Sequence, residues 1–284
     1  MKRDILNSPR LTELKKHRRK TILNKILLCL LGLFAVFFLF AYLSRLKTLN
    51  ISEIQITGNK VVDTEAIKTV VEGQIAGKYL WLFPKSNIFF YPENNIKHEL
   101  WNEFKRINNI NLSINNNKIL EISLTERDAK YTWCGEAPDL IAKLPSEEQC
   151  YFMDANGYIF DIAPYFSGDV YFKFYGVAEL GSYFLKKNFQ PLISFKDILI
   201  GMGLKPVALY TTDGGDIQIF LSGGTSLTDV PKILFKADAD LENVAENLQA
   251  ALNTEPLLSK FKNNYSKLQY IDLRFGNKVY DKFQ

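Results

Sequence analysis

The alternation of apolar and polar residues divides the chain into a basic start, an apolar stretch and a long mixed region. Between Lys25 and Arg45 lie nineteen uncharged residues, ILLCLLGLFAVFFLFAYLS. As a helix they extend about 28 Å, close to the hydrocarbon thickness of a bilayer. A buried core helix normally keeps a polar face, and this stretch has none. We therefore predict a single transmembrane helix at 26–44.

A cleaved signal peptide is the alternative interpretation of this stretch. Signal peptides usually have a shorter apolar region and a small-residue cleavage site, whereas this one ends in Phe-Ala-Tyr-Leu-Ser-Arg. Six Lys or Arg residues lie within 15–25, against three (Arg45, Lys47 and Lys60) soon after the span. The positive-inside rule then predicts a cytoplasmic tail at 1–25 and an extracytoplasmic remainder.

The positive charge of the chain belongs to this tail. Residues 1–25 hold nine Lys or Arg against two acidic residues, a net charge of +7, while the whole chain carries +4. The remainder is therefore net negative, at −3. A nucleic-acid-binding domain would carry a basic stripe on its fold, so we expect no nucleic-acid partner.

Apolar alternation predicts a β-α-α-β-β domain at 48–126. Strand patterns occupy 51–57, 110–114 and 120–124, and helix patterns occupy 63–72 and 93–106. Asp63 is the expected N-cap of the first helix. Between the helices, the aromatic loop 79–91 has two interpretations: it packs beneath the helices, or it forms an exposed patch that binds a partner helix or lipid headgroups.

The segment 127–284 is rich in strand signals. Hairpins are predicted around Asn156-Gly157 and Gly214-Gly215, and helices at 194–203 and 240–252, the second with Asp238 or Asp240 as N-cap. The predicted fold class is α+β: a transmembrane helix, the β-α-α-β-β domain, and a β-rich domain whose helices pack on an antiparallel sheet.

The cysteines and the possible reactive groups complete this picture. Cys134 and Cys150 flank one loop in an exported region, which favours a disulfide; two free thiols are the alternative. The two histidines, His17 and His98, are predicted on opposite sides of the membrane, so no His-based metal site or catalytic triad can form. Four aspartates resemble paired glycosidase carboxylates but lie at turns, where Asp is common: Asp154, Asp161, Asp213 and Asp216. We expect no enzyme, cofactor or metal.

Three stretches resemble the bacterial cell-division family FtsQ/DivIB, over about residues 20–284. EIQITGNKVVDTEAI and LEISLTERDAKYTW resemble the start and end of that family's POTRA domain, with Glu126-Arg127 followed by Trp133 at the exit. YIDLRFGNKVY resembles the terminal strand of its β domain. The resemblance implies a non-enzymatic scaffold of the divisome in the inner membrane at the division septum, with FtsB-like and FtsL-like membrane proteins as partners.

Two other classes remain as alternatives. A POTRA-bearing chaperone or secretion component would bind extended polypeptides, but such proteins often carry several POTRA units. An anchored cell-wall enzyme would need catalytic residues of the kinds discussed above.

The last residues, LQYIDLRFGNKVYDKFQ, predict a strand, a turn at Gly276-Asn277 and a final strand at 279–283. Simple alternation places Leu268, Tyr270, Asp272 and Arg274 on one side, and Gln269, Ile271, Leu273 and Phe275 on the other. Because Ile271 and Leu273 suit the core, Asp272 and Arg274 are expected to face outward.

The final strand is expected to leave one backbone edge unpaired. Charges at Lys278, Asp281 and Lys282 would make it an inert edge; alternatively, a partner adds a strand there by β-augmentation. By resemblance this is where FtsB binds, with Arg274 and Phe275 matching an Arg-aromatic pair in which Phe replaces the usual Tyr. The expected contact residues are Asp272, Arg274, Phe275, Val279 and Tyr280. Arg274→Glu, Phe275→Ala or loss of Val279–Gln284 is then expected to abolish binding while the domain stays folded.

Overall fold

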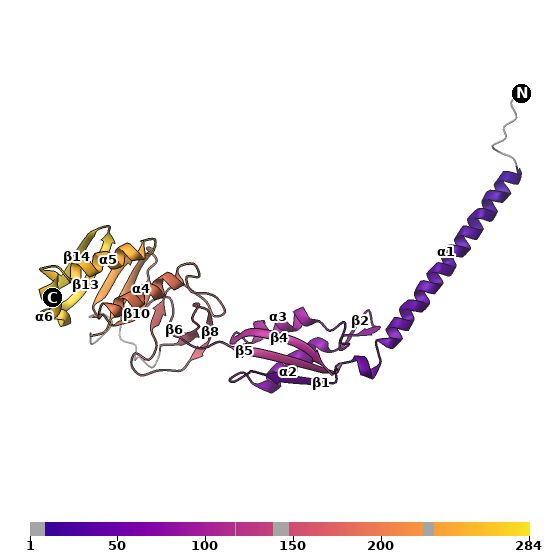
Figure 1. The fold of residues 1–284 in the computed structure, drawn as a ribbon, viewed down its shortest axis with the longest axis horizontal. Coiled ribbons are helices and arrows are strands. Elements are labelled where there is room, and N and C mark those ends of the chain that lie inside the picture. The colour runs from indigo at the N-terminus through magenta and orange to yellow at the C-terminus, as the bar shows by residue number, and fades with distance from the viewer. Residues whose placement is uncertain (1–8, 117, 139–147, 224–229) are drawn as a thin grey trace, which may run out of the picture. The chain divides into compact units, whose positions relative to one another are not determined.

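A computed structural model describes residues 9–116, 118–138, 148–223 and 230–284. Residues 1–8 of the predicted tail and 139–147 of the loop between the cysteines lie outside the described residues. The chain forms two compact units, which divide between Glu126 and Arg127 (Figure 1). The fold is α+β, as predicted.

The first unit begins with one long helix, α1 (Pro9–Leu43). It starts well inside the predicted tail, with proline at its first position, where a missing N–H costs nothing. Among the described residues, only this helix is long and apolar enough to cross a membrane, over Lys15–Leu43. Its apolar side chains are exposed on all sides, among them Leu28, Leu33 and Phe40. A core helix of a soluble domain would bury such residues, whereas a membrane span and a signal sequence both fit.

The rest of the first unit has the predicted β-α-α-β-β order, with a small hairpin added between the helices. After a 3₁₀ turn (Lys47–Leu49) the elements are β1 (Glu53–Thr57), α2 (Thr64–Ile75), β2 (Lys78–Tyr79), β3 (Phe83–Pro84), α3 (Glu93–Glu103), β4 (Ile107–Asn115) and β5 (Ile119–Glu126). Asp63 caps α2 by accepting the N–H of Ala66, as predicted.

The sheet of the first unit has the order β1-β5-β4, with β1 parallel to β5 and β4 antiparallel to it. Its apolar positions fall in register, so that Ile56, Ile122 and Leu112 lie side by side on one face. Ile67 and Ile96, from α2 and α3, are fully buried in the same cluster. Both helices therefore cover one face of this sheet.

The second unit is built on one nine-stranded sheet with the order β14-β13-β12-β11-β10-β9-β6-β7-β8. The strands are β6 (Tyr131–Trp133), β7 (Cys150–Met153), β8 (Ile159–Ala163), β9 (Lys173–Tyr175), β10 (Pro206–Thr211), β11 (Asp216–Leu221), β12 (Lys232–Lys236), β13 (Leu268–Phe275) and β14 (Lys278–Phe283). The helices are α4 (Phe189–Gly201), α5 (Leu241–Leu252) and α6 (Leu257–Asn264), followed by a 3₁₀ turn (Tyr265–Lys267). The hairpins at Asn156-Gly157 and Gly214-Gly215 are confirmed.

The predicted antiparallel sheet is wrong in one respect, because the sheet is mixed. β9 pairs in parallel with both β10 and β6, and β12 pairs in parallel with β13. Helix α4 connects β9 to β10, and α5 with α6 connect β12 to β13. A crossover of this length returns the chain in the same direction, which gives a parallel pair.

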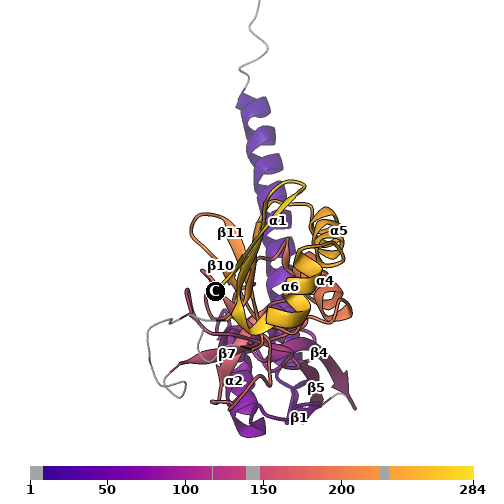
Figure 2. The same ribbon diagram turned by 90° about the vertical axis from the view of Figure 1, so that its left-hand side faces the viewer.

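All three helices lie on the same side of the sheet (Figure 2). The main core lies between these helices and the sheet. It includes Phe195 and Leu199 of α4, Leu248 of α5 and the strand residues Ile219 and Ile233. The other face, here called the open face, carries a smaller apolar cluster at its centre: Cys134, Tyr175, Ala208, Phe220 and Val230. The candidate site lies at the β14 edge of this sheet.

Candidate partner-binding edge

Strand β14 forms one edge of the nine-stranded sheet. It pairs with β13, and among the described residues no strand pairs with its other side. Its side chains alternate between exposed and partly buried. Val279 and Phe283 pack against the helix-covered core, while Lys278, Tyr280 and Lys282 are exposed. An edge strand of six residues is a template on which another strand can pair.

The backbone groups available at this edge follow from one hydrogen bond. Gln284 donates its N–H to the carbonyl oxygen of Lys267 at 2.8 Å, so its N–H points toward β13. N–H groups alternate in direction along a strand. Those of Asp281 and Phe283 therefore point away from β13, toward the position of an added strand.

Two aromatic side chains lie next to this edge. Phe275, the last residue of β13, is 57% exposed, and Tyr280 is 49% exposed. Their rings meet edge to face, with centroids 5.4 Å apart and planes at 86°. Exposed aromatic residues beside an unpaired edge are typical anchors of a binding surface.

Phe275 reaches this position through an irregularity in β13. Simple alternation places it on the same side as Leu273, which is buried in the core. The pairing with β14 shifts register between Asp272 and Phe275, so Phe275 pairs with Lys278 and shares the face of Tyr280. A second shift, between Leu268 and Tyr270, turns Leu268 into the core. The predicted sides of Phe275 and Leu268 were therefore wrong, because an extra residue in one strand reverses the alternation.

Arg274 makes ion pairs within the domain on the open face. Its Nε and Nη2 donate to the two carboxylate oxygens of Asp272, at 2.9 and 2.6 Å. Its Nη1 donates to Oδ2 of Asp216 at 2.6 Å. Two carboxylates of the same domain thus occupy the fork of the guanidinium, the geometry in which arginine pairs most strongly.

These contacts shift the pKa values of Asp272 and Arg274. Burial of Asp272 opposes its charged form, but the hydrogen bonds and charge of Arg274 outweigh that effect and hold the pKa of Asp272 below its ordinary value. The hydrogen bonds from Arg274 to Asp272 and Asp216 raise the pKa of the guanidinium. Asp272 and Arg274 are therefore charged and paired with each other at neutral pH.

This pairing corrects the expected roles of Asp272 and Arg274. Asp272 lies on the face away from the helices, as expected, but it is only 5% exposed and both of its carboxylate oxygens accept from Arg274. Arg274 is partly exposed but already holds two acidic side chains. Arg274→Glu would place three carboxylates together, so a loss of binding in that variant would not separate docking from unfolding.

Asp216 was missed as a member of this cluster. Its position beside a turn suggested that its carboxylate bonds its own backbone, whereas it accepts from Arg274. Asp154, in contrast, accepts the N–H groups of Asn156 and Tyr158, as a turn aspartate does. It also pairs with Arg127 at 2.5 Å.

The three charged residues that were expected to make the edge inert lie on different faces of the sheet. Asp281 pairs with Lys260 of α6 at 3.1 Å on the helix side of the sheet. Lys278 and Lys282 are exposed on the side of Tyr280. Two lysines beside an aromatic pair discourage self-association and favour a partner that carries acidic residues.

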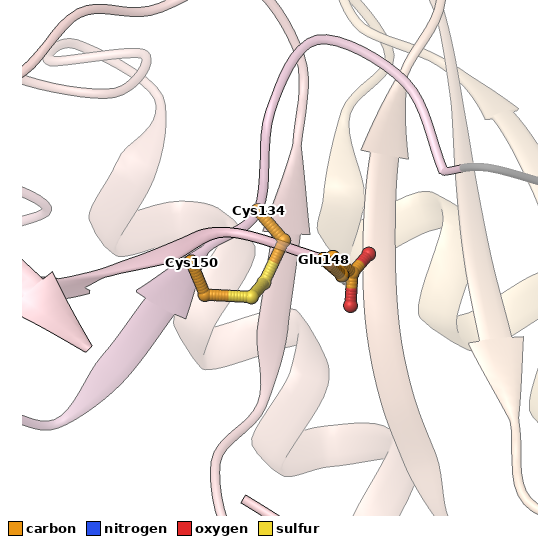
Figure 3. Close-up of side chains that lie close together, drawn as sticks. All are labelled: Cys134, Glu148 and Cys150. Atoms are coloured by element: carbon orange, nitrogen blue, oxygen red, sulfur yellow. A yellow bond between two sulfur atoms is a disulfide. The ribbon is translucent and has the colours of Figure 1, made fainter. Parts of the chain in front are cut away.

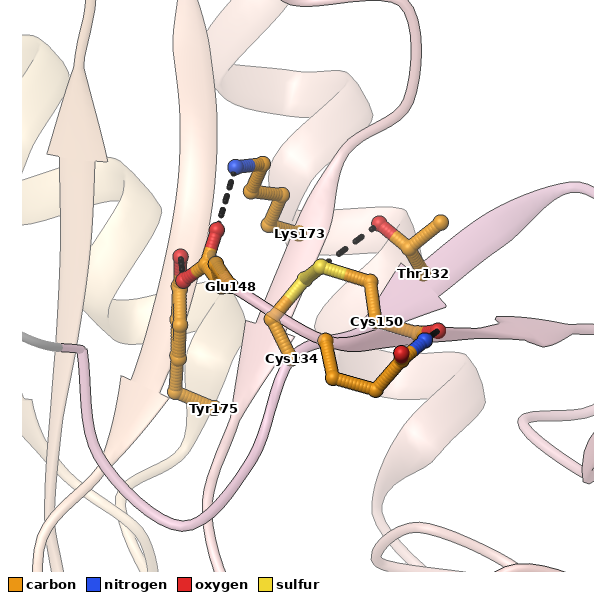
Figure 4. Close-up of a disulfide and its surroundings, with 7 residues drawn as sticks. Thr132, Cys134, Glu148, Cys150, Lys173 and Tyr175 are labelled. Carbon is orange, nitrogen blue, oxygen red and sulfur yellow. Dashed lines mark hydrogen bonds and ion pairs between the residues drawn. A yellow bond between two sulfur atoms is a disulfide. The ribbon is translucent and has the colours of Figure 1, made fainter. Parts of the chain in front are cut away.

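Cys134 and Cys150 form a disulfide that joins the start of β7 to the residue after β6 (Figure 3). Beside it, Glu148 accepts hydrogen bonds from Lys173 and from the Tyr175 hydroxyl, each at 2.7 Å (Figure 4). Burial and the neighbouring carboxylate raise the pKa of Tyr175. Ligand atoms of Cys134, Glu148 and Cys150 lie within 4.8 Å of one another, but bridged sulfurs are not the thiolates that metals bind. The disulfide and these hydrogen bonds therefore have a structural role.

No protein-family model matches this chain, and no curated protein matches it.

Proposed function

We propose that this protein is a membrane-anchored, non-enzymatic scaffold of the bacterial divisome, and that it binds a partner by β-augmentation at β14. The observation that carries the proposal is the edge strand itself. β14 offers a backbone edge with no partner strand among the described residues, together with an exposed aromatic pair and two lysines. A partner strand gains affinity from main-chain hydrogen bonds and specificity from side chains at alternate positions.

The order of elements supports the same proposal. An apolar helix is followed by a β-α-α-β-β domain and then a β-rich domain, the arrangement that the resemblance to FtsQ/DivIB implies. The expected partner is an FtsB-like membrane protein, accompanied by an FtsL-like one. Tyr280 stands directly beside Phe275, and so supplies a hydroxyl near the position where the family carries a tyrosine.

The test is binding of the full-length protein to the FtsB-like protein of the same organism, in detergent, with matched variants of Asp281. Asp281→Pro removes an N–H that points away from β13 and so blocks the added strand, while the pairing with β13 remains. Asp281→Ala removes the same ion pair with Lys260 but keeps the N–H. We expect the proline variant to lose binding and the alanine variant to keep it.

Two further readouts complete this test. Phe275→Ala and Tyr280→Ala are expected to weaken binding about tenfold or more each, as aromatic anchors do, with unchanged circular dichroism. A fluorescent fusion is expected at midcell. Equal binding by Asp281→Pro and Asp281→Ala would reject β14 as the docking edge, and an even signal around the envelope would favour a chaperone or secretion role.

A further inference from the structure

The loop between α2 and α3 exposes a group of large apolar side chains, here called the aromatic patch: Tyr79, Leu80, Trp81, Phe89 and Phe90. Trp81 is 90% exposed, Leu80 is 78% exposed and Phe89 is 72% exposed. The interpretation that this loop packs beneath the helices is therefore wrong for these residues. Contiguous exposed apolar groups of this size mark an interaction surface.

The backbone holds the tip of the patch outward at a conformational cost. Leu82 donates its N–H to the carbonyl oxygen of Tyr79, which closes a turn whose central residues are Leu80 and Trp81. Both have positive φ, 47° and 59°. Such turns normally use Asn and Gly, since bulky residues are strained there. Strain at exposed residues points to a functional position for these side chains.

Several contacts attach the patch to the C-terminal end of α1. Phe37 of α1 meets the ring of Phe83 at 5.4 Å, and Phe83 meets Phe90 at 6.0 Å. Arg45 donates to the carbonyl oxygen of Leu82 at 3.2 Å. The patch therefore begins where the apolar helix ends.

Asn87 fixes this junction from inside. It is buried, and its amide donates to the carbonyl oxygen of Ser44 at 2.9 Å, just after the end of α1. Its side-chain oxygen accepts the N–H of Phe89 at 3.0 Å. One side chain thus couples the exposed Phe89 to a backbone carbonyl that the helix leaves unpaired.

The two segments that form the patch and its junction with α1 carry only positive charges. The segment 78–92 contains Lys78 and Lys85 and no acidic residue, and 42–52 contains Arg45 and Lys47 and no acidic residue. Aromatic rings with lysine and arginine beside them are the usual composition at the boundary between the bilayer and water. Anionic headgroups attract such basic residues.

We infer that the aromatic patch inserts into the headgroup layer of the membrane that α1 spans, and so holds the first domain against the bilayer surface. This inference rests on the part of the proposed function that makes α1 a membrane anchor. It does not depend on the partner at β14.

The test uses the full-length protein in lipid nanodiscs that contain anionic lipid, with bromine placed on the acyl chains either near the headgroup or near the chain end. Bromine quenches nearby tryptophan. The emission of Trp81 is the difference between the wild type and Trp81→Phe. We expect shallow bromine to lower this component about twofold or more, and more than deep bromine does, as for an interfacial tryptophan.

Trp101→Phe is the matched control, because Trp101 is also partly exposed in the first domain but lies on α3. The emission of Trp101 is expected to be unaffected by bromine.

Carbonate extraction and protease protection report separately on the membrane insertion of α1. If α1 is inserted but Trp81 is not quenched, the inference is overturned and the anchor stands. If lipid bromine quenches Trp81 and an aqueous quencher does not, the inference is supported. If neither quencher reaches Trp81, a protein partner covers the patch and the inference is overturned. If carbonate releases the chain, the anchor and the inference both fail.

Discussion

Arg274 and Asp216 are separated by one intervening strand, yet their side chains form an ion pair of 2.6 Å across the open face. In the sheet register, Leu234 of β12 lies opposite Asp272 of β13 on one side and opposite Gln218 of β11 on the other. The guanidinium therefore links β13 to β11 over the top of β12. This link ties the terminal hairpin to the body of the sheet.

Removal of this link is expected to destabilise the second domain. Arg274→Ala leaves the buried Asp272 without its main partner, which costs about 1–3 kcal/mol in the free energy of unfolding. Arg274→Lys is expected to lose less, because it keeps the charge but not the fork. Urea unfolding of the full-length protein, followed through Trp133 in the second domain, measures both. Lys282→Ala controls for the loss of a nearby positive charge, and equal midpoints in all variants would contradict the role assigned to Arg274.

The same cluster predicts a pH dependence. The pKa of Asp272 is lower in the folded than in the unfolded chain, so on acidification the unfolded chain takes up a proton first and stability falls. The contribution is complete above the ordinary aspartate pKa of about 4 and is lost as the pH falls through the folded value. Unfolding midpoints measured from neutral pH downward test this. Asp272→Asn is expected to flatten the acid limb, whereas Asp213→Asn, at an exposed turn, is not; equal slopes would argue against the effect.

Glu126 is expected to hold the loop between β1 and α2 in place. Its Oε1 accepts the N–H groups of Lys60, Val61 and Val62 at 2.7, 2.9 and 3.0 Å. Burial opposes its charge, but these backbone donors hold the pKa of Glu126 below its usual value. Glu126→Ala is expected to speed hydrogen exchange at these three amides about tenfold or more, as loss of about 1.4 kcal/mol would. Glu121→Ala, on the same strand, is the control, and unchanged protection in Glu126→Ala would refute this role.

The disulfide predicts how many cysteines react with a thiol reagent. In denaturant without reductant, only Cys29 is expected to react with a maleimide, and with reductant all three cysteines of the chain. The bridge is expected to add about 3 kcal/mol to the free energy of unfolding, because it closes a loop in the unfolded chain. Mass spectrometry counts the labels. Three labels without reductant would show that the bridge does not form.

The topology prediction concerns α1. Protease added outside spheroplasts is expected to digest the chain after the apolar helix and leave a small basic fragment in the membrane. Sealed inverted vesicles are the control, in which the domains should be protected. Release of a shortened, soluble protein from untreated cells would instead identify the helix as a signal sequence.

The local elements could be predicted from the sequence because their signals are local. Asn156-Gly157 marks a hairpin, Asp63 and Asp240 cap helices, and the alternation at Ile110–Ile114 marks a strand. The parallel pairs could not be predicted in this way. They join strands separated by helices, and nothing in the local alternation of β12 or β13 specifies the direction of the neighbour.

The candidate site was harder to predict for the same reason. The edge strand and its turn followed from local pattern, but the sides of Leu268 and Phe275 depend on register shifts set by pairing with β14. The partnership of Arg274 with Asp216 depends on two further pairings across β12. Charge complementarity between residues 58 positions apart became visible only when the sheet order was known.

The pairing of β14 with β13 also determines how this domain would bear load. Hydrogen bonds between antiparallel strands lie perpendicular to the strands, so tension applied along β14 strains every bond of the ladder at once instead of opening them in sequence. A partner strand added at β14 would be held in the same geometry. Arg274 would then pass part of that tension past β12 to Asp216, so the hairpin would act as a mechanical coupling as well as a recognition surface.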